Sequence, residues 1–246
     1  MMLTGKITTT RHNHVKEVPG ILTMGRTHSI AEDFRTLVGS HIAHDIPVDS
    51  MCYNNSFRKN RDTHSYRAIF IVIDNPQEFI ESLALVESIR TQNQASIIFV
   101  AVTGKGTYNK MKYYLAGADH CIKFTTLPNE KCDVLTDFFD SAEWQKKHSL
   151  LLDPTRMCLI GDYKKLDVSF PEMKILEAFS ETRNQILSHD EIARIMGLNI
   201  NFYDPRALEK SISRLRGKIK GMYGTNAIQS IRGHGYRLIR GLIATA

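Results

Sequence analysis

Two short, uninterrupted apolar runs, AIFIVI at residues 68–73 and SIIFVAV at residues 96–102, constrain the fold most strongly. Such runs are typical of strands that are buried on both faces of a parallel sheet. Shorter segments predict further strands at 20–25, 46–53 and 121–124, and helical spacing of apolar residues predicts helices at 29–38, 79–90, 109–116 and 129–139. This alternation predicts an α/β fold, a flavodoxin-like doubly wound domain.

The pattern changes after residue 140. Segment 141–150 is polar and predicts a linker, and 151–168 has the short apolar stretches and turn signals of small antiparallel strands. Three predicted helices and a hairpin follow. We therefore expect a flexible lead over 1–19, one domain over 20–140, a linker over 141–150 and a second, α+β domain over 151–246. A serine followed three residues later by a glutamate predicts three helix starts, with the pairs Ser29–Glu32, Ser169–Glu172 and Ser188–Glu191.

The third helix of the second domain is predicted over residues 205–220. Asp204 is a suitable N-cap, and Pro205 suits the first helical position. Apolar residues recur at spacings of four, three and four and form one stripe that faces a core: Leu208, Ile212, Leu215 and Ile219. From residue 205 onward the chain carries nine basic side chains and one acidic one, whereas residues 1–150 are nearly balanced, with 17 basic and 16 acidic side chains. A structured basic segment favours a polyanionic partner, and we expect double-stranded DNA.

The side chains expected to contact DNA lie on this helix and on the hairpin that follows. Long cations opposite an anchored stripe suit the major groove, where arginine and lysine reach guanine. The sequence IQSIRGHGYRL at 228–238 predicts a hairpin, because Gly233 and Gly235 flank His234 and permit a tight turn. A hairpin directly after such a helix is typical of a wing. The candidate DNA-binding residues are Arg206, Lys210, Ser211, Arg214, Arg216 and Lys218 on the helix, and Arg232, His234 and Arg237 on the hairpin.

Residues 151–240 resemble the winged helix-turn-helix effector domain of OmpR/PhoB-type response regulators. The resemblance depends on LLLDPTRMCLIGDYKKLDVSFPEMKILEAF, ISRLRGKIK and IQSIRGHGYRL, in the order that the family has. It implies that the third helix enters the major groove and that the wing contacts the minor-groove side. It also implies that loop 197–203 is the segment offered to RNA polymerase. The expected function is transcription regulation by sequence-specific DNA binding.

The first domain resembles the receiver of the same family, through GADHCIKF at 117–124, but lacks its chemistry. The family needs an acidic pair after the first strand to hold Mg²⁺, an aspartate after the third strand to accept phosphate, and a lysine. In this sequence Arg26 and Thr27 stand at the acidic pair and Val72 at the acceptor position, whereas Thr103 and Lys123 are retained. The departures predict an atypical response regulator that acts independently of aspartate phosphorylation. The alternative is a phosphorylation-controlled two-component regulator that uses Asp74, two residues after the acceptor position.

The resemblance also implies a homodimer, paired through the receiver-like domain and bound to repeated half-sites. The face that the family uses for this pairing has lost its usual charges here. The predicted last helix of the domain carries no arginine, and His120 replaces an acid. Pairing would then be more apolar, through Tyr113, Tyr114, Leu115 or Phe138.

An enzyme is the other class of function, in which a flavodoxin-like domain binds a nucleotide or a flavin. Gly104-Lys105-Gly106 is too short for a phosphate-binding loop, and no nucleophile elbow is present. The four cysteines include no C-x-x-C pair, so neither a disulfide framework nor a zinc site is expected. We therefore predict no catalytic residue, no metal and no cofactor. No apolar run approaches the roughly 20 residues of a membrane helix, which predicts a cytoplasmic protein without membrane contact.

Overall fold

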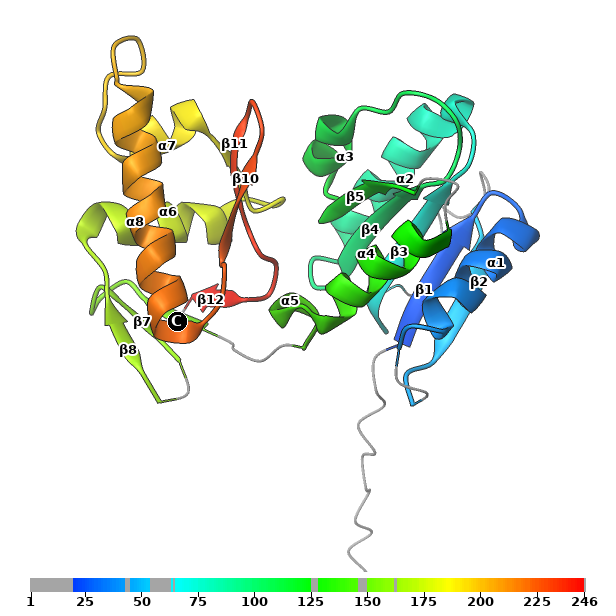
Figure 1. Ribbon diagram of the computed structural model, residues 1–246. Coiled ribbons are helices and arrows are strands. Elements are labelled where there is room, and N and C mark those ends of the chain that lie inside the picture. Colours follow the sequence, from blue (N-terminus) through cyan, green and yellow to red (C-terminus); the bar gives the residue numbers. More distant parts are fainter. Residues whose placement is uncertain are drawn as a thin grey trace, which may run out of the picture.

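The computed structural model describes residues 20–42, 45–53, 63, 65–124, 128–145, 150–161 and 163–245. These residues form two domains that lie beside each other, an α/β domain and a smaller α+β domain (Figure 1). The predicted lead over 1–19, and residues 146–149 of the predicted linker, lie outside the described residues. None of the helices in the described part of the chain combines the length and hydropathy that crossing a membrane requires.

The N-terminal domain is built on a five-stranded parallel sheet with the order β2-β1-β3-β4-β5. Its strands are β1 (Gly20–Gly25), β2 (Val48–Cys52), β3 (Tyr66–Ile73), β4 (Ile97–Val102) and β5 (His120–Lys123). The register pairs Phe70 with Phe99 across β3 and β4. This strand order confirms the predicted doubly wound fold.

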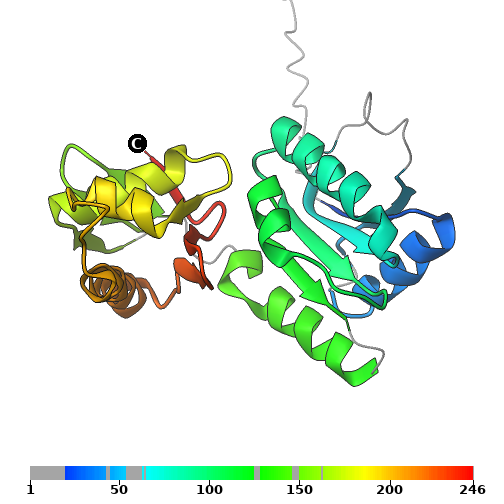
Figure 2. The same ribbon diagram turned by 90° about the horizontal axis from the view of Figure 1, so that it is seen from above.

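Helices cover both faces of this sheet (Figure 2). Helices α1 (His28–Gly39) and α4 (Pro128–Asp140) contribute to one core cluster, and α2 (Phe79–Gln92) and α3 (Lys110–Ala116) to the other. Successive residues of β3 enter opposite clusters, with Phe70 on the α1/α4 side and Ile71 on the α2/α3 side. The uninterrupted apolar runs follow from this arrangement, because neither face of the strands meets water.

Helix α1 begins differently from the prediction. Thr27, not Ser29, is its N-cap, and the Thr27 hydroxyl accepts a hydrogen bond of 3.4 Å from the amide of Ile30. The expected capping partner, Glu32, instead accepts a hydrogen bond from the hydroxyl of Ser50 on β2. The predicted Ser29–Glu32 capping box is therefore wrong, because a contact with the neighbouring strand holds the carboxylate.

A short helix, α5 (Ala142–Gln145), occupies the first half of the predicted linker. Its Trp144 is buried in the α1/α4 core, with ring centroids 5.7 Å from Phe138 and 5.1 Å from Phe139. The guanidinium of Arg67 lies 4.0 Å from the centroid of the indole. This half of the linker therefore packs on the N-terminal domain, while the domain boundaries as such stay a prediction.

The C-terminal domain contains two small sheets and three helices. A four-stranded sheet has the order β12-β6-β7-β8, and a three-stranded sheet has the order β10-β11-β9. Its elements are β6 (Leu150–Asp153), β7 (Cys158–Ile160), β8 (Lys165–Asp167), α6 (Phe170–Glu181), β9 (Ile186–Ser188), α7 (His189–Ile195), α8 (Pro205–Tyr223), β10 (Ile228–Ile231), β11 (Gly235–Leu238) and β12 (Ile243–Thr245). The three helices and the hairpin are those predicted, whereas β9 and β12 were not predicted.

The capping boxes predicted for α6 and α7 are present. The amide of Ser169 donates to the carboxylate of Glu172 at 2.8 Å, and that of Ser188 to Glu191 at 2.7 Å. Burial raises the pKa of Glu172, but hydrogen bonds from Lys218 and Ser169 outweigh it, so the pKa of this carboxyl is lowered. Hydrogen bonds from Ser188 lower the pKa of Glu191. These caps fix where α6 and α7 begin, and so the position of the core on which α8 packs.

Candidate functional site

Helix α8 is held to the domain by its apolar stripe. Leu208, Ile212, Leu215 and Ile219 are all buried in the core of the C-terminal domain. The Asp204 carboxylate accepts from the amide of Arg206 at 2.9 Å, which caps the helix at the residue expected. A helix fixed along one side presents its opposite side in a constant orientation.

Three cations form a row on that opposite side. Arg206, Lys210 and Arg214 are each four residues apart and exposed. Within the described part of the chain, none of the three has a hydrogen bond or an ion pair through its side chain. Ser213 and Gly217 lie on the same face, and a Cβ added at Gly217 would meet no heavy atom within 4 Å outside the backbone of its own helix. The row is therefore accessible from solvent along its length.

The other three predicted side chains of this helix are engaged within the domain. Arg216 donates to the carbonyl of Ile228 at 2.7 Å and to the hydroxyl of Ser230 at 2.9 Å, both on β10. Lys218 forms an ion pair of 2.7 Å with Glu172 on α6. The Ser211 hydroxyl donates to the carbonyl of Ala207. Arg216 thus holds the hairpin against α8, and Lys218 ties α8 to α6.

The hairpin of β10 and β11 turns at Gly233, whose φ of +74° lies in the left-handed region that favours glycine. Arg232, immediately before the turn, is exposed, and His234 is half-buried. Gly235 is required because a Cβ there would lie 2.1 Å from the carbonyl oxygen of Leu187 on β9. The close pairing with β9 fixes the hairpin. Its tip, which carries Arg232, lies at the same end of the domain as the start of α8 (Figure 1).

Arg237 lies elsewhere. It is 5% exposed, its guanidinium donates to Gln229 at 2.7 Å, and it covers the ring of Tyr114 in the N-terminal domain at 5.3 Å. In this arrangement it faces the N-terminal domain and not solvent. Of the nine predicted DNA-binding side chains, four are exposed cations without a partner in the described structure: Arg206, Lys210 and Arg214 on α8, and Arg232 at the hairpin tip.

An internal network occupies the region in which the resemblance to a receiver predicts the phosphorylation site. Arg26 donates to Glu78 at 3.4 Å, and the hydroxyl of Tyr53 donates to the same carboxylate at 2.9 Å. Glu78 is buried, and burial raises its pKa, while the bonds from Tyr53 and Arg26 oppose the rise. Sequence reasoning missed Glu78 and Tyr53, since the sequence PQE at 76–78 has the character of an exposed turn and carries no signal of burial.

The remaining residues of the predicted degenerate site lie around the carboxyl ends of the strands. Val72 is buried in the α1/α4 core, and Asp74 is exposed directly after β3. The Thr103 hydroxyl donates to the carbonyl of Ile73, and the Lys123 ammonium donates to the carbonyl of Gly106 at 2.7 Å. Thr27 serves as the cap of α1. Asp74, Thr103 and Lys123 therefore lie at the carboxyl ends of β3, β4 and β5, and the Lys123 ammonium is bonded to a backbone carbonyl.

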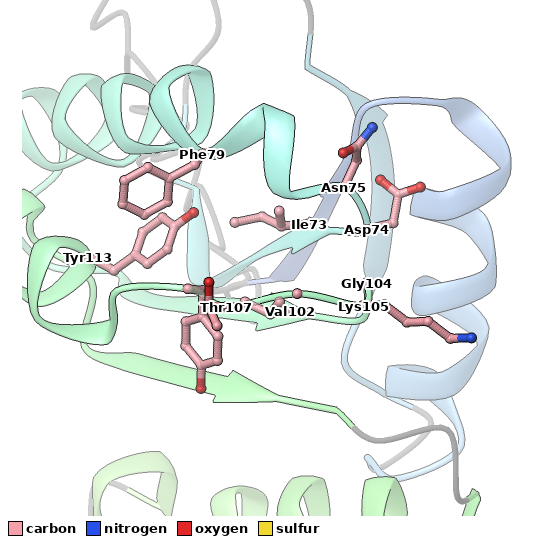
Figure 3. A pocket seen from close by; sticks show the side chains of 11 residues that line it. Ile73, Asp74, Asn75, Phe79, Val102, Gly104, Lys105, Thr107 and Tyr113 are labelled. Atoms are coloured by element: carbon pink, nitrogen blue, oxygen red, sulfur yellow. The ribbon is translucent and has the colours of Figure 1, made fainter.

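A narrow cavity lies beside these strand ends (Figure 3). Phe79 and Tyr113 line one end of it, and Asp74, Asn75 and Lys105 lie at the other. Its volume of ≈ 20 Å³ is enough for about one water molecule. This cavity is therefore too small for the nucleotide or flavin of the enzyme alternative.

The residues at the carboxyl ends of these strands do not fit the Mg²⁺ ion of a phosphorylatable receiver. The ion is held by oxygen ligands that include one or two carboxylates, but Arg26 places a positive charge beside the Glu78 carboxylate. Among the described residues, no group of three or more histidine, cysteine, aspartate and glutamate side chains could hold a metal ion.

Comparison with known proteins adds to this description. Residues 164–238 match the family described as "Transcriptional regulatory protein, C terminal". The chain is also similar to the uncharacterized transcriptional regulatory protein YvcP of Bacillus subtilis (strain 168). The two are 21% identical over 178 residues, which cover 68% of this chain and 75% of that protein.

Among solved structures, the response regulator DrrB of Thermotoga maritima, an OmpR/PhoB homologue, is 13% identical. Its match covers 90% of this chain and 99% of that chain, with a TM-score of 0.38. The DNA-binding domain of CadC from E. coli is 21% identical over 35% of this chain and 82% of that chain, with a TM-score of 0.32. At these scores the fold assignment rests on the strand order described above. The family match confirms the predicted DNA-binding domain of a transcription regulator, and it spans α6, α7, α8 and the hairpin.

Proposed function

We propose that this DNA-binding transcription regulator reads double-stranded DNA with the exposed face of α8 in the major groove and the tip of the β10–β11 hairpin against the adjacent backbone. The observation that carries the proposal is the row of Arg206, Lys210 and Arg214, exposed and without partners in the described chain; Arg232 is likewise exposed at the tip of the hairpin. Cations held in a fixed row can meet phosphates and guanine edges without first breaking internal bonds.

The experiment is selection from a pool of random duplexes by the full-length protein, followed by sequencing. The expected result is one enriched half-site, with affinity that falls steeply as salt increases. A matched variant, Arg156→Ala, removes an exposed arginine far from α8 in the sequence and is expected to select the same site. Failure to enrich any sequence would refute sequence-specific reading.

The proposed regulator acts independently of aspartate phosphorylation. This part of the proposal is supported by the Arg26–Glu78 ion pair, which stands where the metal would bind, and by Lys123, which is bonded to the carbonyl of Gly106. Beryllofluoride with Mg²⁺ is expected to change neither the selected site nor the apparent mass on gel filtration. An effect of beryllofluoride that Asp74→Asn abolishes would support phosphorylation at Asp74 instead.

We further propose that the protein binds repeated half-sites as a dimer paired through its N-terminal domains. Leu115 is 48% exposed on α3, whereas Tyr114 lies under Arg237 of the C-terminal domain. Pairing through this face therefore requires the C-terminal domain to move aside. Two enriched half-sites at a constant spacing, lost in a Leu115→Glu variant that still binds one half-site, are the expected result.

Loop 197–203 is the proposed contact with RNA polymerase. Phe202 in this loop is 86% exposed, an unusual position for a phenylalanine unless a partner covers it. Phe202→Ala is expected to reduce transcription from the selected site and to leave DNA affinity unchanged. Unchanged transcription would exclude this contact.

A further inference from the structure

The two domains are joined by a set of polar contacts away from the linker. Side chains of the C-terminal domain reach α2, α3 and the start of β5. Arg183 donates to the carbonyl of Glu87 at 2.9 Å and to the hydroxyl of Thr91. Asn184 donates to the carbonyl of Leu115. Together with Arg237 over Tyr114, these bonds define what we call the closed arrangement.

Asp119 lies at the centre of this interface. One of its carboxylate oxygens accepts from Arg90 at 2.6 Å and from the amide of Ile98 at 2.9 Å, both in its own domain. The other oxygen accepts from Arg240 of the C-terminal domain at 2.8 Å. Asp119 is 4% exposed, so three protein hydrogen-bond donors take the place of water around its carboxylate. Arg240 supplies its bond from across the interface and also donates to the carbonyl of Gln94.

The interface carries more positive than negative charge. Arg90, Arg237 and Arg240 are each more than nine-tenths buried, and Asp119 is the buried carboxylate that faces them. Burial lowers the pKa of Arg90 to about 10 even beside Asp119. One guanidinium nitrogen of Arg237, Nη1, is buried without a hydrogen-bond partner in the described structure. Buried cations with too few anionic partners weaken the closed arrangement and leave it open to competition from another anion.

We propose that Asp119 is a latch that holds the closed arrangement, and that double-stranded DNA competes with the N-terminal domain for the arginines of the C-terminal domain. Arg237 lies on β11, one strand of the hairpin whose tip carries the exposed Arg232. DNA phosphates near the hairpin supply the negative charge that the closed interface lacks. The closed form then binds DNA more weakly than the open form, so the latch sets the affinity of the regulator. This inference rests on the proposed DNA-binding function.

The latch responds to competing anions and not to physiological pH. Burial alone would raise the pKa of Asp119. The positive charges of Arg90, Arg240 and Arg237 have the larger effect and lower this pKa to about 2. The carboxylate therefore stays ionised at every pH at which the protein is expected to work. The apparent dissociation constant equals that of the open form divided by the open fraction. If one molecule in ten is open, full opening strengthens binding by about tenfold.

Two variants of the full-length protein test the latch. Asp119→Asn removes the carboxylate. Arg240→Gln removes the bonds of Arg240 to Asp119 and to the carbonyl of Gln94 while leaving the Asp119–Arg90 pair of the N-terminal domain intact. The second variant serves if the first does not fold. Arg156→Gln makes the same substitution as Arg240→Gln at an exposed position and is the control for that variant. In the absence of DNA, small-angle X-ray scattering should give a larger radius of gyration for both latch variants and an unchanged one for the control.

The second measurement is the affinity for the duplex selected above. Asp119→Asn is expected to bind several-fold more tightly than the parent, because it opens the interface and keeps every arginine. An unchanged radius of gyration in both latch variants would refute the latch. An open Asp119→Asn variant with unchanged affinity would refute competition by DNA. If no form of the protein binds DNA while the variants still open, the proposed function fails and the latch stands.

Discussion

Arg214 and Arg216 lie two residues apart on α8, yet the structure assigns them opposite tasks. Arg214 is exposed and has no partner in the described chain, whereas Arg216 makes two hydrogen bonds to β10 and lies 5.5 Å from the ring centroid of Tyr236. Truncating each to alanine should separate DNA binding from stability. Arg214→Ala should weaken DNA binding without changing stability, and Arg216→Ala should do mainly the reverse.

The magnitudes follow from the contacts. Each hydrogen bond of Arg216 is worth about 1 kcal/mol in this half-buried position, and the contact with Tyr236 adds roughly 0.5 kcal/mol, so Arg216→Ala should cost about 2.5 kcal/mol. In a domain of this size such a loss lowers the melting temperature by about 10 °C or more. Arg214→Ala should change stability by less than about 0.5 kcal/mol. It should weaken binding to the selected duplex by roughly 1–3 kcal/mol if it reads a base.

Differential scanning calorimetry of the full-length protein gives the first quantity, and fluorescence anisotropy with the selected duplex, well below the melting transition, gives the second. Arg156→Ala is the control for the loss of one arginine charge. Hydrogen exchange at the amides of β10 should become faster only in Arg216→Ala. The reasoning is refuted if Arg214→Ala lowers the melting temperature as much as Arg216→Ala, or if Arg216→Ala leaves it unchanged.

Three further predictions concern single contacts. Arg232→Ala should reduce the slope of log affinity against log salt by about 1, as expected for the loss of one phosphate contact, and an unchanged slope in a salt titration would remove Arg232 from the interface. Ser188→Ala should destabilise the protein to urea by about 1 kcal/mol through loss of the α7 cap, and an unchanged midpoint would contradict that role. Because the folded-state pKa of Asp119 is depressed to about 2, its contribution to stability is complete above about pH 4, the unfolded value, and is lost as pH falls through 2. Acid titration of folded Asp119→Asn should lack this loss, and an identical acid profile would contradict the depressed pKa.

Much of the fold could be predicted because its signals are local. The uninterrupted runs of β3 and β4 reflect burial on both faces, and the four-three-four spacing on α8 follows from helix geometry. The capping boxes at Ser169 and Ser188 involve residues three apart, so the sequence contains both partners. The failure at Ser29 has a physical cause, since Ser50, on a strand 18 residues after Glu32, holds the carboxylate that a local rule would assign to the cap.

The short strands β9 and β12 could not be predicted for a related reason. Each has three residues and owes its pairing to a distant segment, β9 to β11 and β12 to β6. Trp144 likewise lies within the polar segment predicted as a linker, and only its contacts with the rings of Phe138 and Phe139 show why it is buried. Three-residue segments carry too little pattern to be separated from loops.

The sequence by itself determined that a basic helix and a hairpin follow an α/β domain, and that Arg26 stands where a metal site needs an acid. It could not determine which cations are available to DNA. Arg206, Arg216 and Arg237 are alike in a sequence, and they differ only in what the folded chain places beside them: solvent, the carbonyl of Ile228, and the ring of Tyr114. Only the tertiary structure decides this, because the partner that occupies or frees a guanidinium comes from another element, and in the case of Arg237 from another domain.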